Sequence, residues 1–249
     1  MITFLRRLRR SFLDTGAFRK YFLYAVGEIL LVVIGILIAL QINNWNERNK
    51  TNSKVNELLI ALQQDLSRDT LLILDNMPFI LDQYQFNESL RAKVAKPDAT
   101  LDTLIQVMHH EFNPNWRAQI TYNSNAYNSL NQTGLIEHLP DGLKTSIKNF
   151  YNRKSTLRAR IEKTTNDYQG KITSYVDTYT FGSTEIHDQG PLIDRLVWKD
   201  IDPGHLAATF QGISNFKRIL FTETREELDY SLTSSRKLIA EIENYLNFP

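Results

Sequence analysis

The side chains able to do acid-base or metal chemistry are few and scattered. The sequence holds five histidines, at His109, His110, His138, His187 and His205. The adjacent His109 and His110 would face about 100° apart on a helix, so their rings do not easily share one metal ion. One local cluster, Glu185, His187 and Asp188, has the carboxylate and imidazole groups that bind zinc. Because polar loops near glycine often contain such triplets, we predict no metal site and no cofactor.

Nucleophile and nucleotide-binding motifs are absent from the sequence. The chain has no cysteine, which excludes disulfides, thiolate metal sites and cysteine nucleophiles. It also lacks a Walker loop, a paired-glycine dinucleotide fingerprint, an H-E-x-x-H helix, a G-x-S-x-G elbow and an EF-hand loop. No paired carboxylates support a hydrolase of cell wall or lipid. We therefore predict that the protein is not an enzyme.

Four tyrosines follow one another along a stretch with helical spacing: Tyr151, Tyr168, Tyr175 and Tyr179. Two interpretations of this row remain open. The tyrosines would either line a pocket for an aromatic ligand or belong to the core with their hydroxyls at its rim. The second arrangement is the commoner one in helical proteins.

The chain that must position these residues has the composition of an ordinary globular protein, with basic residues concentrated at its N-terminal end. Of 249 residues, 42% are hydrophobic and 23% are charged, and the formal net charge is +1. This near balance is not that of a nucleic-acid-binding protein, so we predict no nucleic-acid partner. The first 20 residues nevertheless carry six basic side chains against Asp14, namely Arg6, Arg7, Arg9, Arg10, Arg19 and Lys20.

An apolar stretch follows this basic segment directly. Residues 21–42 are apolar except for Glu28 and Gln41. As a helix rising about 1.5 Å per residue, they would span about 33 Å, against a hydrocarbon core of about 30 Å. A cleaved signal peptide is the competing interpretation, but no small-x-small cleavage site follows the apolar run. We predict an uncleaved transmembrane helix over residues 21–44, with the lipid bilayer as a partner.

The distribution of lysine and arginine predicts the orientation of this helix. The flank before it carries six basic residues, whereas the near flank after it carries three, offset by two acidic ones. The positive-inside rule then keeps residues 1–20 in the cytoplasm and exports residues 45–249, which in a bacterium places them in the periplasm. The six basic residues would either contact the anionic inner leaflet or serve only as this topology signal.

Three residues of the predicted span are candidates for contact with another membrane helix. Glu28 is an ionisable group inside the apolar run, and its carboxylate would either reach the cytoplasmic interface or pair with a polar group of a partner span. Gly35 and Ala39 form a small-xxx-small pair that lets a second helix approach closely.

Two stretches resemble a known family. They are KYFLYAVGEILLVVIGILIALQINNWNE, from Lys20 to Glu47, and AYNSLNQTGLIEHLPDGLKTSIKNFYN, from Ala126 to Asn152. Both resemble recurring segments of a family of uncharacterised single-span cell-envelope proteins of Bacteroidota-type bacteria. The resemblance implies an inner-membrane anchor and a helical periplasmic domain of unknown role, and it brings no catalytic residue.

The exported part reads as helix nearly throughout. Apolar residues recur at spacings of three and four over residues 55–84, 143–179 and 206–246. Pro78 predicts a kink or break near Met77. Around these stretches, Ser124 is a plausible N-cap, Gly134 a plausible helix end, and residues 182–204 a capping loop that has room for a helical turn. The predicted fold is therefore all-α, with an N-terminal transmembrane helix followed by one domain, an antiparallel bundle of long helices.

Two classes of function fit these features. The first is a membrane-anchored periplasmic interaction or scaffold protein, which binds a protein partner or a second copy through its span or its bundle. The alternative is a periplasmic ligand-binding module that resembles a sensor domain and acts with a separate output subunit.

Overall fold

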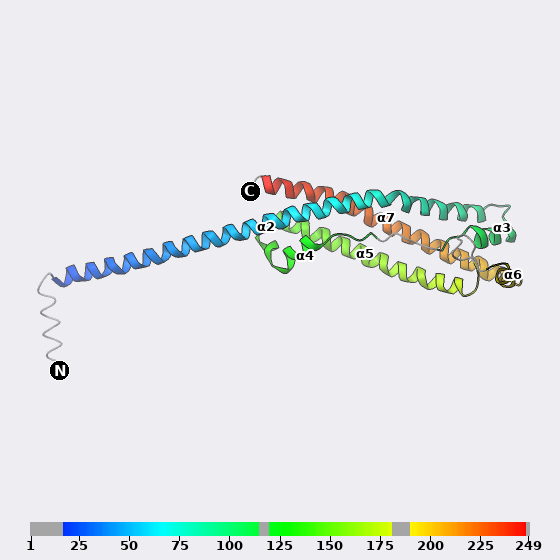
Figure 1. Ribbon diagram of the computed structural model, residues 1–249, viewed down its shortest axis with the longest axis horizontal. Helices are drawn as coiled ribbons and strands as arrows, with labels where there is room; N and C mark the ends of the chain where they lie inside the picture. The colour runs from blue at the N-terminus through cyan, green and yellow to red at the C-terminus, as the bar shows by residue number, and fades with distance from the viewer. Residues whose placement is uncertain (1–16, 115–119, 181–189, 248–249) are drawn as a thin grey trace, which may run out of the picture. The chain divides into compact units, whose positions relative to one another are not determined.

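The computed structural model describes residues 17–114, 120–180 and 190–247, and these ranges are helical with no β-strand (Figure 1). The α-helices are α2 (Ala17–Val94), α3 (Leu101–Gln106), α4 (Asn125–Gln132), α5 (Asp141–Val176), α6 (Pro191–Trp198) and α7 (Pro203–Asn247). A π-helix, η1 (Val107–Glu111), continues α3, and a 3-10 helix, η2 (Leu135–His138), follows α4. The all-α prediction is thus confirmed.

The chain forms two compact units, Met1–Val55 and Asn56–Pro249, and α2 contributes to both. In the first unit, every side chain from Arg19 to Lys50 is exposed. The apolar stretch there is long and apolar enough to cross a membrane, and none of it is buried. An apolar helix of this length with no protein around it fits a bilayer as its solvent.

The second unit is built around α5, α7 and the second part of α2. Contacts between α2 and α7 pair Gln63 with Glu243 and Asn87 with Ser214, so these two helices run antiparallel. Helix α7 also runs antiparallel to α5, along which it packs (Figure 1). Helices α2 and α5 therefore run in the same direction, and the short elements between residues 95 and 140 return the chain along the bundle.

The predicted apolar faces form the core of this unit. Along α2, the buried face of this unit includes Leu59, Leu62, Leu66, Ile73 and Ile80. One core cluster joins Leu90 and the η1 residues to Tyr168, Tyr175 and α7, and another joins Ile73 and Ile80 to Phe221 and Leu228. The helical periodicity of the sequence therefore identified the buried faces correctly.

Of the kink or break predicted near Met77, the break does not occur, because α2 continues through Pro78. Proline lacks the N–H that would bond the carbonyl of Leu74, four residues earlier. Both Pro78 and Leu74 are exposed, so water can bond that carbonyl. The buried residues Ile73 and Ile80 flank the proline and hold the helix against the core on either side.

The predictions for the short helices and their ends are confirmed in part. Gly134 follows α4 in the left-handed conformation, with a φ of 71°, as predicted for a residue that ends a helix. Ser124 does occupy the N-cap position of α4, but its side chain makes no capping hydrogen bond. The carboxylate of Asp65 on α2 instead accepts a hydrogen bond from the backbone N–H of Ala126 (3.3 Å). The predicted capping loop contains the eight-residue helix α6.

Candidate functional site

The predicted site residues of the span lie on one face of α2. At 100° per residue, Glu28, Gly35 and Ala39 fall within about 40° of one another around the helix. A Cβ atom added to Gly35 would meet no atom within 4 Å. Arg19 and Lys20 are described and lie in the exposed first turns of α2. Arg6, Arg7, Arg9 and Arg10 lie outside the described residues.

The three metal-ligand residue types noted in the sequence, Glu185, His187 and Asp188, for which no metal site is predicted, also lie outside the described ranges. Among the residues that the structure describes, no three His, Asp or Glu side chains come close enough to hold a metal ion. His109 pairs with Asp194 of α6 (2.7 Å), and its ring stacks on Trp198. His205 shares a hydrogen bond with Tyr179 (2.7 Å).

Three of the four tyrosines in the predicted row belong to the core, whereas Tyr151 of α5 is half-buried and lines a separate pocket. Tyr168, Tyr175 and Tyr179 are buried, and the Tyr175 hydroxyl donates a hydrogen bond to the carbonyl of Met108 in η1 (2.9 Å). Burial raises the pKa of Tyr168 and Tyr175 well above the ordinary value. These hydroxyls therefore stay protonated and tie α5 to the chain that crosses it.

A buried cluster of charged side chains joins the three long helices. Asp69 of α2, Lys154 of α5 and Glu227 of α7 are 1%, 5% and 3% exposed. The Lys154 ammonium donates to Oδ2 of Asp69 (3.3 Å). The other oxygen, Oδ1, accepts hydrogen bonds from the backbone and side-chain N–H groups of Asn123 (2.9 and 3.0 Å). Asp69 thereby fixes both α5 and the segment before α4.

Tyr122 completes this cluster from the segment before α4. Its ring lies under the Lys154 ammonium, 3.3 Å from ring centroid to Nζ, and its hydroxyl donates to Oε2 of Glu227 (3.0 Å). Ser231 donates to the other oxygen of Glu227 (2.9 Å). Burial and the negative charge of Glu227 raise the pKa of Tyr122 far above its usual range. Burial lowers the pKa of Lys154, and the attraction of Asp69 and Glu227 opposes that shift.

This cluster has a structural role, because it fixes how the three long helices pack. Each charged group has polar or aromatic partners from another element, and such satisfied buried networks fix one packing arrangement. Lys154 lies within the helical pattern predicted over residues 143–179, but Asp69 and Glu227 were not predicted as site residues. A signal was present, since Asp69 lies at core spacing between Leu66 and Ile73. A charged residue at a core position predicts a buried partner of opposite charge.

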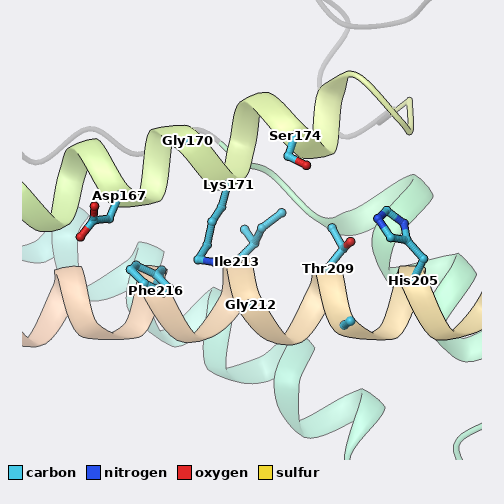
Figure 2. Close-up of a pocket in the computed structure, with 10 residues that line it drawn as sticks. Asp167, Gly170, Lys171, Ser174, His205, Thr209, Gly212, Ile213 and Phe216 are labelled. Carbon is cyan, nitrogen blue, oxygen red and sulfur yellow. The ribbon is translucent and has the colours of Figure 1, made fainter.

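A second feature is a groove of about 510 Å³ between α5 and α7. Gly170, Lys171 and Ser174 of α5 face Thr209, Gly212 and Phe216 of α7 across it (Figure 2). Asp167 lies at one end of this row and His205 at the other. Polar, basic and apolar groups therefore line one open space. No sequence motif marked it, because its two walls lie far apart in the chain.

Comparison with known protein families assigns the chain to one of them. A family of unknown function, DUF6090, matches residues 28–174, which is more than half of the sequence. The chain belongs to this family. Neither a curated protein nor a solved structure matches the chain.

The family region of this DUF6090 protein covers the span face but only part of the buried charged cluster. It contains Glu28, Gly35 and Ala39 of the apolar stretch, and Asp69 and Lys154 of the buried cluster. Helix α7, which supplies Glu227 and one wall of the groove, lies beyond it. A family region that ends before α7 therefore lacks one of the three long helices of the bundle.

Proposed function

We propose that this DUF6090 protein is a membrane-anchored interaction or scaffold protein of the cell envelope, without enzymatic activity. Residues 21–44 cross the inner membrane of a Bacteroidota-type bacterium, residues 1–20 lie in the cytoplasm, and the helical domain lies in the periplasm. The single observation that carries this proposal is the fully exposed apolar part of α2, whose Glu28, Gly35 and Ala39 share one face.

The exposed apolar part of α2 supports the anchor. Side chains such as Tyr21, Leu31 and Ile42 are more than half exposed. Burying apolar area is worth about 25 cal/mol per Å², so a row of such side chains in water is strongly unfavourable. A bilayer removes that cost along the whole row. The basic segment before it supports the N-inside orientation and contact with the anionic inner leaflet.

The shared face supports association with another span. Two small residues, Gly35 and Ala39, allow close approach of a second helix, and Glu28 supplies a polar group on the same face. Such contacts contribute about 1 kcal/mol each, which shifts an assembly several-fold. The second span belongs either to another copy of this chain or to a partner protein.

Disulfide crosslinking of the full chain in cells tests this association. Asn46 lies eighteen residues after Glu28, or five helical turns, and thus on the same face. Because the chain has no cysteine, Asn46→Cys introduces its sole thiol. In the oxidising periplasm we expect disulfide-linked dimers of this variant, or mixed disulfides with a partner protein that carries a cysteine near this position. Glu28→Leu and Gly35→Leu should each reduce them several-fold while protein level and membrane insertion stay unchanged.

A bulky substitution on the opposite face is the matched control. Val33 lies about 140° around the helix from Glu28, so Val33→Phe adds comparable volume away from the proposed contact. This variant should crosslink as the Asn46→Cys parent does. If Glu28→Leu and Gly35→Leu also crosslink like the parent, the span is only an anchor and the association proposal is wrong.

A further inference from the structure

The groove between α5 and α7 is an open space. Small residues occupy facing positions on its two walls: Gly170 and Ser174 on α5, and Ala208 and Gly212 on α7. A Cβ atom added to Gly170 would meet nothing within 4 Å, and one added to Gly212 would have only the Lys171 Nζ atom nearby, at 3.9 Å. The glycines therefore do not serve close helix packing. They leave room for a molecule of small-ligand size.

Lys171 places a positive charge in this space. Asp167 lies one turn earlier on α5, in the order that favours an ion pair along a helix. Lys171 instead reaches toward α7, with Nζ 4.7 Å from the centroid of the Phe216 ring (Figure 2). In the part of the chain that the structure describes, no carboxylate lies within ion-pair distance of this ammonium. The face of the Phe216 ring, which carries partial negative charge, lies beside this ammonium.

Hydroxyl and imidazole groups lie on the His205 side of Lys171. Ser174 and Thr209 line the groove, and neither hydroxyl bonds a protein group in the described ranges. By contrast, the nearby Thr173 and Thr178 hydroxyls donate to carbonyls of their own helix. Tyr179 already occupies Nδ1 of His205, which leaves Nε2 as the polar atom of that ring with no protein partner among the described residues.

Apart from Asp167, the remaining lining is apolar. Ile213 is buried at the floor, and Phe216 presents its ring beside Lys171. The carboxylate of Asp167 lies beyond Phe216, at the end of the groove opposite His205 (Figure 2). A second negative group on that side of a ligand would approach the Asp167 carboxylate, and two like charges close together repel each other. The lining thus fits one negative group near Lys171 and an apolar body against Ile213 and Phe216.

We propose that the α5/α7 groove binds a small organic monocarboxylate with an apolar or aromatic body. Lys171 pairs with the carboxylate, the hydroxyls of Ser174 and Thr209 donate hydrogen bonds to it, and Phe216 and Ile213 contact the body. This site does not depend on association of the spans. It gives the bundle a ligand-binding role in addition to the proposed interaction role.

Fluorine NMR of the full-length protein in lipid nanodiscs tests the site. The probe is 4-fluorophenylacetate, and its uncharged counterpart of the same shape is 2-(4-fluorophenyl)ethanol. We expect the protein to broaden the signal of the carboxylate probe, relative to empty nanodiscs, and to leave that of the alcohol nearly unchanged. Lys171→Met keeps the side-chain stem and removes the charge, so the probe should bind about tenfold more weakly. Gly212→Leu should abolish binding by filling the groove.

Lys163→Met is the matched control, because Lys163 lies exposed on α5 and does not line the groove. It should bind the probe as wild type does. Circular dichroism separates loss of the site from loss of the fold in Gly212→Leu. The proposal is wrong if the carboxylate probe does not bind wild type at millimolar concentration, if the alcohol binds equally well, or if Lys171→Met binds like wild type.

Discussion

The two parts of helix α2 differ in how their apolar residues are distributed. From Arg19 to Lys50 every side chain is exposed, and the apolar residues form an almost unbroken run. From Val55 onward, buried residues recur at spacings of three and four and polar residues fill the positions between them. One continuous helix therefore carries two patterns, each suited to a different surrounding medium.

This difference shows what each environment demands of a helix. A bilayer surrounds a helix on every side, so all its faces must be apolar, whereas a bundle covers only one face. Polar groups are accordingly rare in residues 21–42 of the first part, where Glu28 and Gln41 are the exceptions. In the second part, Asp69 is tolerated in the core because Lys154 and Asn123 satisfy its carboxylate.

The largest expected effect concerns the topology of the first part. A phosphatase fused after Pro249 should be active, because the enzyme matures only in the periplasm and the basic flank keeps the N-terminus inside. Replacing all six basic residues before the span by Gln should lower that activity severalfold by weakening the orientation signal. The orientation is measured by phosphatase assays together with the fluorescence of a second fusion made at the same C-terminal end. An inactive phosphatase with a bright fluorescent fusion would reverse the proposed orientation.

The next largest effect concerns the buried cluster of charged side chains that joins the second part of α2 to α5 and α7. Lys154→Met leaves Asp69 and Glu227 buried without their cation, which should destabilise the bundle by about 3 to 5 kcal/mol. Adding Asp69→Asn removes one unpaired charge and keeps an acceptor for Asn123, so the double variant should be more stable than Lys154→Met alone. Denaturant unfolding followed by circular dichroism measures both, with the exposed Lys163→Met as control. Equal stability of Lys154→Met and wild type would show that the cluster does not hold the helices together.

The smallest effect is a pH dependence of the stability of the helical bundle into which the second part of α2 packs. Lys217 of α7 is 4% exposed, and burial lowers its pKa to about 8. Between pH 8 and 10 the unfolded chain binds a proton that the folded chain has lost, so the free energy of unfolding should rise with pH in this window, by up to about 3 kcal/mol. Lys154 shifts in the same direction. The buried tyrosines, whose pKa values are raised, lower stability only above about pH 10.

Lys217→Met should remove most of that rise. Unfolding of the variant and of wild type at pH 7.5 and 9.5 measures the difference, and Lys163→Met should keep the wild-type slope. The Lys217 ammonium also donates to the carbonyl of Asn113 (2.7 Å), so the variant loses a hydrogen bond at both pH values. An unchanged slope in Lys217→Met would mean that this lysine titrates as it does in the unfolded chain.

Much of the fold could be predicted from particular residues. The run after Lys20, the seams on α2, α5 and α7, and the helix end at Gly134 were all visible in the sequence. These features depend on hydropathy and backbone preference within a few turns of the same helix. The sequence left a kink and a break open at Pro78, because the proline's effect depends on whether the carbonyl that it frees is exposed, which is a tertiary property.

The sequence by itself determined the all-α class, the apolar stretch able to span a membrane and the faces that become buried, since local periodicity encodes these. Only the tertiary structure decided that Asp69, Lys154 and Glu227 meet, and that small residues of α5 and α7 face each other across a groove. Asp69 and Lys154 are 85 residues apart, and their contact depends on the register of the helices. That register is set by the packing of whole faces and by the chain's return between residues 95 and 140, so no local pattern records it.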